Sequence, residues 1–315
     1  MSFKRFLLIL ISSFALVVIA DIATGLALRR YTANHRFPGD YEKIDYIARE
    51  CQADNILVGA SLCANDLVTS VFEEALGESV FNCGANGQSI VYCGVVVDAL
   101  MRRHPPKRVF LTIGHTDIKN FSYGRLPLLN IYYRTDIFTP ILDHSLEKAS
   151  QFGKLGMRST LLRMNTYWWR LLLYHFISFN EMGQGGYIAK PVRDWHPDEK
   201  LDYRPRGSDA SAHMPEECLR QLDSIVENCR RNGTELIIIV PPYFGDFGEI
   251  PQMLDLREYA HKKGVRLYED VALKEIADRG ELFYDDFHLN DRGAHEYSRL
   301  FMQRYLEQTL NGDGR

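Results

Sequence analysis

Hydrophobic residues are most concentrated near the N-terminus, where an almost uncharged run extends from Phe6 to Leu28. A pair of basic residues stands on each side of this run, and Asp21 is the one charged residue inside it. A transmembrane helix needs about 20 apolar residues, and the run has this length. We therefore predict that residues 1–30 form an N-terminal membrane anchor.

Two other interpretations of this run remain open. The first is a cleaved signal peptide, because Val18 and Ala20 are small enough to form a cleavage site before Asp21. The second is a buried core helix, which is disfavoured because the run is apolar on every face. Both the anchor and the signal peptide place the rest of the chain on the extracytoplasmic (periplasmic or outer) face of a membrane, or in solution after cleavage.

Short apolar runs of strand length recur along the rest of the chain. They are rich in β-branched residues and continuous rather than alternating, which is typical of strands buried on both faces of a sheet. The last of the runs is the weakest. They comprise residues 55–61, 79–85, 108–114, 235–243 and 265–270.

Segments with apolar residues at helical spacing separate these strands. Such an alternation predicts βαβ units, and hence an α/β fold with a central parallel sheet covered by helices on both faces. Glycines at 233 and 264 act as stop signals for two of the helices. The predicted helices cover residues 89–103, 214–231, 252–263 and about 291–310.

The predicted α/β domain extends over residues 53–311, after a polar lead-in at 31–52. A long insertion at about 120–212 interrupts it, because strands and helices do not alternate clearly there. This insertion contains the aromatic stretch "NTYWWRLLLYHFISF" at 165–179. Its Trp and Tyr faces suit a platform for carbohydrate, but a buried or membrane-adjacent helix is the favoured interpretation.

Charge and cysteine content narrow the function classes. The net charge of -4 gives no reason to expect nucleic-acid binding, which needs a clustered basic face. The chain has six Cys, an even number that permits disulfides outside the cytoplasm, although buried free thiols are at least as consistent with it. No C-x-x-C spacing occurs among them, so a zinc site has little support.

Candidate chemistry is found directly after the predicted strands, where ligand sites of open α/β sheets lie. "GASL" follows the first strand and places Ser61 at a strand-to-helix turn, and "GHTD" follows the third. "DDFH", after the weak fifth strand, spaces Asp285 three residues before His288. A serine hydroxyl needs a base to become a nucleophile, and an aspartate can orient a histidine for that role.

These segments, in this order, resemble the blocks of the SGNH (GDSL-type) hydrolase superfamily. "GASL" resembles its first block and carries the nucleophile onto Ser61, while "DDFH" resembles its last block and carries the acid and the base onto Asp285 and His288. "NGQS" is similar to the second block and makes Gly87 an oxyanion donor, beside the amide of Ser61. "GHTD" resembles the third block, G-x-N-D, and assigns the third oxyanion donor to Thr116. The match covers residues 53–119 and 235–308.

The resemblance implies a flavodoxin-like three-layer α/β/α fold. The sequence departs from the family pattern at two positions. Ala60 replaces an Asp that is not part of the triad. Thr116 replaces an Asn, and a Thr hydroxyl reaches less far than an Asn amide. His115 and Asp117 beside it are possible substitutes, and Asp286 is a second possible orienter for His288.

The resemblance further implies a serine-dependent acyl ester hydrolase or O-acyltransferase that needs no metal or organic cofactor. Membrane-anchored members of the superfamily suggest that the substrate is O-acetyl groups on cell-envelope or exported polysaccharide. Lipid esters remain an alternative substrate. The alternative is a catalytically degenerate protein that binds glycan or scaffolds envelope assembly. The expected partners are therefore an acylated carbohydrate or other ester, the membrane and envelope-assembly proteins.

Overall fold

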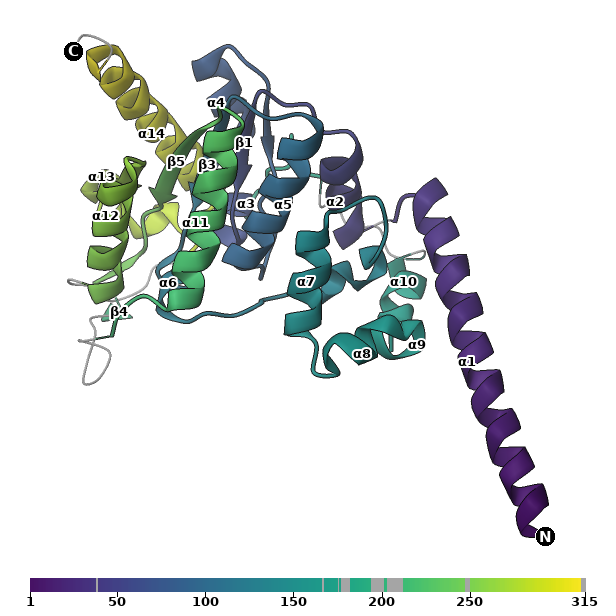
Figure 1. The fold of residues 1–315 in the computed structure, drawn as a ribbon. Coiled ribbons are helices and arrows are strands. Elements are labelled where there is room, and N and C mark those ends of the chain that lie inside the picture. The colour runs from purple at the N-terminus through teal and green to yellow at the C-terminus, as the bar shows by residue number, and fades with distance from the viewer. Residues whose placement is uncertain are drawn as a thin grey trace. The chain divides into compact units, whose positions relative to one another are not determined.

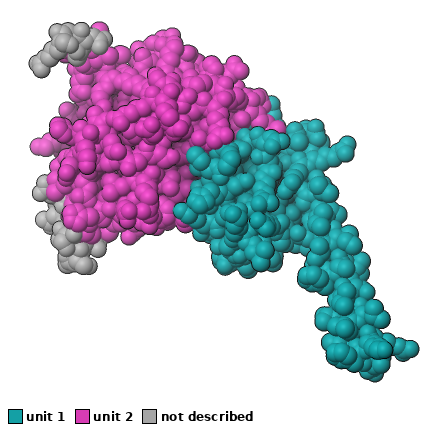
Figure 2. Space-filling view, viewed as in Figure 1, with its two compact units in different colours: residues 1–45, 126–179 teal, residues 46–125, 180–315 magenta. Residues whose placement is uncertain are grey.

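The computed structural model describes residues 1–37, 39–165, 167–174, 176, 182–193, 201–202, 212–246 and 250–312. It divides the chain into two compact units, which Figure 2 colours separately. We call residues 46–125 and 180–315 the sheet unit, and residues 1–45 and 126–179 the anchor unit. The predicted insertion at about 120–212 thus contributes residues to both units.

The sheet unit is built on a five-stranded sheet in the order β2-β1-β3-β5-β7, in which every neighbouring pair is parallel. This confirms the predicted α/β fold and its central parallel sheet, and the order is that of flavodoxin-like sheets. β1, β2 and β5 are buried along almost their whole length, which explains their continuous apolar runs. The strands are β1 (Asn55–Val58), β2 (Val80–Asn82), β3 (Arg108–Thr112), β5 (Glu235–Val240) and β7 (Arg266–Glu269).

Helices cover the sheet on both faces (Figure 1). α5 (Ile90–Arg103) packs against α11 (Glu216–Arg231) on one face, while α14 (Asp291–Gly312) packs against α3 (Ser61–Asp66) and α4 (Thr69–Leu76) on the other. All four predicted helices are confirmed. Four of the remaining elements of this unit are α6 (His115–Lys119), α12 (Pro251–Lys263), α13 (Lys274–Ala277) and the 3-10 helix η3 (Gly280–Leu282). α2 (Asp40–Arg49) crosses the unit boundary, and β4 (Leu201–Asp202) pairs in parallel with β6 (Gly245–Asp246).

Aromatic side chains fill the core between the sheet and α14. Phe301 of α14 stacks on Phe72 with ring centroids 5.6 Å apart and meets Phe110 of β3 edge-on at 6.1 Å. Tyr268 of β7 lies edge-on to the same ring at 5.1 Å. Such pairs stabilise by about 0.5–1.5 kcal/mol beyond the burial of their area. They fix α14, and with it the segment that immediately precedes it, against the sheet.

The anchor unit is helical and begins with α1 (Phe3–Asn34), which runs past the predicted boundary at residue 30. The most apolar 18 residues of α1 have a mean hydropathy of 2.6 and bury none of their residues, so the buried-core alternative is wrong. Its length and composition suit a membrane anchor or a signal sequence. The other helices of the unit are η1 (Leu126–Tyr132), α7 (Pro140–Ala149), α8 (Gly153–Arg158), α9 (Thr160–Arg163) and α10 (Trp168–Tyr174).

Two further predictions are settled by the structure. α10 lies in the aromatic stretch at 165–179 and leaves Trp169 70% exposed, so a fully buried helix is the wrong interpretation. Thr166, His175 and residues 177–179 of that stretch lie outside the described residues. All six cysteines are buried free thiols, which confirms that alternative over disulfides.

Candidate active site

The turn between β1 and α3 presents Ser61 at the first position of the helix, half-buried. Gly59 makes this turn possible, because a Cβ there would lie 2.9 Å from the main-chain oxygen of Thr112 and 2.7 Å from the Cβ of Cys63. The close approach of β1 and β3 at this point thus requires glycine. The side chain of Ser61 is left at the carboxyl end of the sheet.

His288 is brought to Ser61 from the other end of the chain. Its Nε2 lies 2.8 Å from the Oγ of Ser61, a hydrogen-bonding distance across 227 residues of sequence. Its Nδ1 lies 2.9 and 3.0 Å from the two carboxylate oxygens of Asp285. Ser61, His288 and Asp285 are therefore joined in an unbroken hydrogen-bonded series, and Asp285 rather than Asp286 makes the contact with the ring.

The carboxylate of Asp285 is held by more than the histidine ring. Its Oδ1 also accepts hydrogen bonds from the main-chain N–H of Phe287 at 3.0 Å and of His288 at 2.8 Å. Burial alone would raise the pKa of Asp285, but the hydrogen bonds and charge of His288 and these two N–H groups outweigh it and lower the pKa to about 2. Asp285 therefore stays ionised at any working pH.

A buried carboxyl beneath the segment fixes its position. The Oδ1 of Asp66 accepts a hydrogen bond of 3.0 Å from the N–H of Leu289, the residue after His288. Asp66 is fully buried, and this burial raises its pKa well above the usual range, which favours the protonated form. Asn290 continues the support, since its side chain donates to the main-chain oxygens of Glu281 and Phe283. No local sequence pattern marks Asp66, because its partner is 223 residues away.

The three predicted oxyanion donors are two main-chain N–H groups, of Ser61 and Gly87, and the hydroxyl of Thr116. Gly87 has a φ of 71°, in the left-handed region that favours glycine, and its carbonyl accepts from the N–H of Arg125. Among the described residues, the N–H of Gly87 and that of Ser61 donate no main-chain hydrogen bond outside the helices and strands. Thr116 lies in the first turn of α6, after β3, and is exposed. No hydrogen bond joins its hydroxyl to Ser61 or His288 in the described part of the chain.

His115 and Asp117, on either side of Thr116, both contact other residues of the sheet unit. The Oδ2 of Asp117 accepts from the N–H of Gly114 at 2.8 Å and closes the start of α6. His115 is stacked on Phe287, with ring centroids 5.8 Å apart, and meets Tyr243 edge-on at 5.2 Å. Burial, assisted by Lys119, lowers the pKa of His115 to about 4, so its ring is neutral. These contacts pack His115 and Tyr243 against Phe287, the residue before His288, a cluster that sequence reasoning missed.

The buried carboxyl of Asp117 is expected to make the free energy of unfolding depend on pH. Burial raises its pKa from 3.8 to about 6 despite the hydrogen bond from Gly114. Because this carboxyl pKa is raised, the contribution of Asp117 to the free energy of unfolding is greatest below about pH 4 and falls by up to about 3 kcal/mol as the pH rises to 6. Asp117→Asn keeps the acceptor without the charge, so urea unfolding should show less stability lost between pH 4 and pH 7 than in the wild type. Equal losses in the two proteins would contradict this account.

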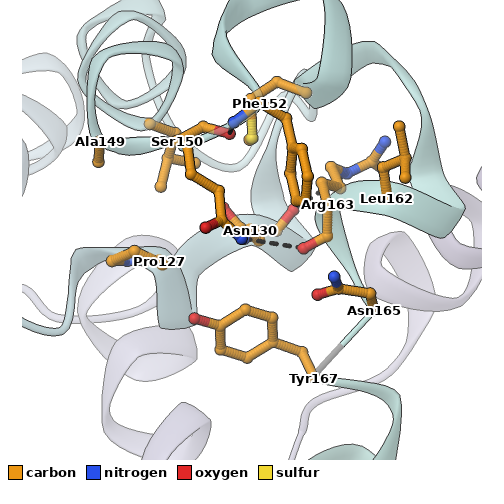
Figure 3. A pocket seen from close by; sticks show the side chains of 12 residues that line it. Pro127, Asn130, Ala149, Ser150, Phe152, Leu162, Arg163, Asn165 and Tyr167 are labelled. Carbon is orange, nitrogen blue, oxygen red and sulfur yellow. Dashed lines mark hydrogen bonds between the residues drawn. The ribbon is translucent and has the colours of Figure 1, made fainter.

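The described residues contain no cluster of three or more His, Cys, Asp or Glu side chains that could hold a metal ion. The anchor unit has a cavity of about 260 Å³, which Figure 3 shows. It lies between η1 and the α8–α9 region, and the side chain of Asn130 bonds there to the main-chain oxygen of Arg163 at 2.9 Å. Its described lining includes Ser150 but no His, Asp or Glu, so this serine has no general base beside it.

The fold and the hydrogen-bonded series define a parallel α/β protein with a Ser-His-Asp arrangement at the carboxyl end of its sheet. No family model matches the chain, and no curated protein matches it. Among solved structures, it is similar to a psychrotrophic esterase, EstA, from Pseudoalteromonas sp., described as inhibited by monoethylphosphonate. The identity is 12%, the match covers 82% of this chain and 99% of that one, and the TM-score is 0.40. A likeness this distant carries no weight for function, which depends on the geometry above.

Proposed function

We propose that this chain is a serine-dependent acyl ester hydrolase or O-acyltransferase with Ser61, His288 and Asp285 as its catalytic triad. The observation that carries the proposal is the series of hydrogen bonds from Ser61 through His288 to Asp285, at 2.8 and 2.9 Å. A nucleophile bonded to a base, itself oriented by a third group, is the arrangement that serine acyl transfer needs. A merely structural serine has no use for a half-buried base oriented in this way.

In the proposed reaction, the Oγ of Ser61 attacks the ester carbonyl while its proton passes to Nε2 of His288. The N–H groups of Ser61 and Gly87, with the hydroxyl of Thr116, stabilise the negative charge on the carbonyl oxygen. His288 then protonates the leaving alcohol, which breaks the ester bond and leaves the acyl group on Ser61. Water or a second alcohol, activated by His288, resolves the acyl-enzyme and restores the serine.

The sequence resemblance to SGNH hydrolases supports O-acetyl groups on cell-envelope or exported polysaccharide as the substrate, with transfer to a sugar hydroxyl or to water. This choice is an analogy. It fits a domain attached to the outer face of a membrane by α1. None of these steps needs a metal or an organic cofactor.

A fluorophosphonate probe tests the function directly, because it phosphonylates a serine only when a neighbouring base activates it. The purified full chain should be labelled, and peptide mass spectrometry should place the adduct on Ser61. The same preparation should hydrolyse p-nitrophenyl acetate, and the label should abolish that turnover. A folded protein that neither labels nor turns over would contradict the proposal.

A non-catalytic role is the second candidate, and the exposed Thr116 is the observation that favours it. If the site is active but the Thr116 hydroxyl reaches the oxyanion less well than an Asn amide would, Thr116→Asn should raise kcat for p-nitrophenyl acetate by about tenfold or more, because a full oxyanion donor contributes about 10² to 10³ in rate. Thr116→Val, which removes the hydroxyl at nearly constant volume, is the matched control. An Asn variant no faster than the Val variant would show that this position supplies no donor.

The extracytoplasmic location is tested by reporter fusions after residue 35, directly beyond α1. We expect signal from a reporter that is active only outside the cytoplasm, because the proposed substrate belongs to the cell envelope. Basic pairs flank the apolar run on both sides, so their charge does not decide the orientation of α1. Activity from a cytoplasmic reporter alone would reverse the orientation. The mass of the mature protein distinguishes a retained α1 from a cleaved signal peptide.

A further inference from the structure

Large exposed apolar side chains outside α1 are concentrated in one stretch of the anchor unit. Eight of them lie between residues 152 and 176, whereas the other described exposed apolar residues beyond α1 are Val192, Leu254 and Leu310. Soluble surfaces rarely gather apolar residues in this way unless another surface covers them. The eight, which we call the apolar platform, are Phe152, Leu155, Leu161, Leu162, Trp169, Leu172, Leu173 and Phe176.

Basic residues accompany the platform, and two carboxylates from outside the stretch contact it: Glu147 pairs with Lys154 at 3.7 Å, and Asp21 accepts from the N–H of Leu161. From residue 148 to residue 180 the sequence has no Asp or Glu but has Lys148, Lys154, Arg158, Arg163 and Arg170. Lys154 and Arg158 are exposed beside Leu155. Leucine and aromatic residues combined with cations are typical of segments that lie in the interface of a bilayer with anionic lipids.

Hydrogen bonds attach the start of α9 to α1 at the position of Asp21. Asp21, the one charged residue of the apolar run, accepts from the hydroxyl of Ser159 at 2.9 Å and from the N–H of Leu161 at 2.7 Å. One turn later Gly25 lets the helices touch, since a Cβ there would lie 2.6 Å from the hydroxyl of Thr160. The start of α9 is therefore fastened beside residue 21, which explains why a carboxylate interrupts the apolar run.

The part of α1 below this attachment has the length of a membrane span. Every residue from Met1 to Ala20 is exposed, whereas burial begins beyond Asp21 with Leu28 and Thr32. At 1.5 Å per residue, residues 3–20 extend over about 27 Å, close to the roughly 30 Å of a bilayer core. A bilayer crossed by these residues would have its surface level with α8 and α9, as the position of these helices along α1 in Figure 1 illustrates.

We propose that the apolar platform is a second membrane contact, in which α8 to α10 lie on the bilayer beside the span of α1. The occupant of this face is lipid: apolar side chains enter the acyl boundary, and Lys154 and Arg158 face anionic headgroups. The inference requires that α1 is retained, but it does not depend on the catalytic proposal.

The test uses the full chain in nanodiscs, with an environment-sensitive fluorophore attached to Leu155→Cys. The six native cysteines are buried, so the introduced thiol is the reactive one. Leu310→Cys is the matched control, because both leucines are 79% exposed but Leu310 lies in α14 of the sheet unit. Lipids spin-labelled near the headgroup should quench the label at 155 by about half or more and leave the label at 310 unchanged, since interfacial side chains lie within about 10 Å of the acyl boundary.

A label at 155 that spin-labelled lipid quenches no more than the label at 310 would overturn the proposal. A blue shift at 155 without lipid quenching would also overturn it, since a protein would then cover this face. Adding anionic lipid should increase the quenching, and Lys154→Gln with Arg158→Gln should abolish that increase. A mature protein that lacks residues 1–20 would remove the span on which the contact depends and would overturn the proposal as well.

Discussion

Replacing Ser61 with Ala is expected to lower kcat/KM for p-nitrophenyl acetate by at least about 10³-fold, because it removes the nucleophile and leaves only binding and oxyanion stabilisation. The Oγ of Ser61 is the one hydroxyl that hydrogen-bonds to Nε2 of His288 within the described chain. The Cβ stays, so the turn around Gly59 should keep its packing. Initial rates at several substrate concentrations, with circular dichroism of the same samples, measure both properties.

Two further variants make this result specific. Ser70→Ala is the matched control, since Ser70 is an exposed serine in the first turn of α4 of the same unit and should be replaceable without loss. His288→Ala should lose about as much activity as Ser61→Ala, and the double variant no more than either, because the two residues act as a unit. Losses that multiply in the double variant, or a Ser61→Ala protein that keeps its activity, would refute the triad.

The order of elements in the sheet unit could be predicted because strands buried on both faces leave continuous apolar runs. Each of the five predicted runs contains an observed strand, and all four predicted helices exist. The parallel arrangement follows from the helices between the strands, since each crossover returns the chain to the same edge. Ser61 and His288 could be paired in advance for the same reason: both follow strands of one parallel sheet, whose carboxyl ends lie together.

What the sequence did not reveal depends on contacts between distant segments. Asp66 bonds to Leu289, and Tyr243 meets His115, across more than a hundred residues, so no local pattern marks either pair. The anchor unit combines residues 1–45 with residues 126–179, a grouping that only packing creates. In this unit, the sequence alone shows Asp21 only as a charge inside an apolar run, because its partners Ser159 and Leu161 lie far away in the sequence.

Replacing Asp285 with Asn should lower kcat by about 10³ to 10⁴-fold while leaving the fold intact, because it changes the tautomer of the histidine. The carboxylate accepts from Nδ1–H of His288 and from two main-chain N–H groups at once. An Asn amide can satisfy the main-chain donors only by turning its NH₂ group toward Nδ1. His288 would then carry its proton on Nε2, where it could no longer accept the proton of Ser61.

Asp286→Asn provides the comparison that separates this mechanism from a loss of charge. Both substitutions remove one negative charge from the same segment, but the ring contacts Asp285, so the Asp286 variant should keep most of its activity. Because the pKa of Asp285 is about 2, the wild type should show no loss of activity between pH 7 and pH 5 from protonation of this group. Equal losses in the two Asn variants would mean that the charge of the segment, and not the orientation of His288, supports catalysis.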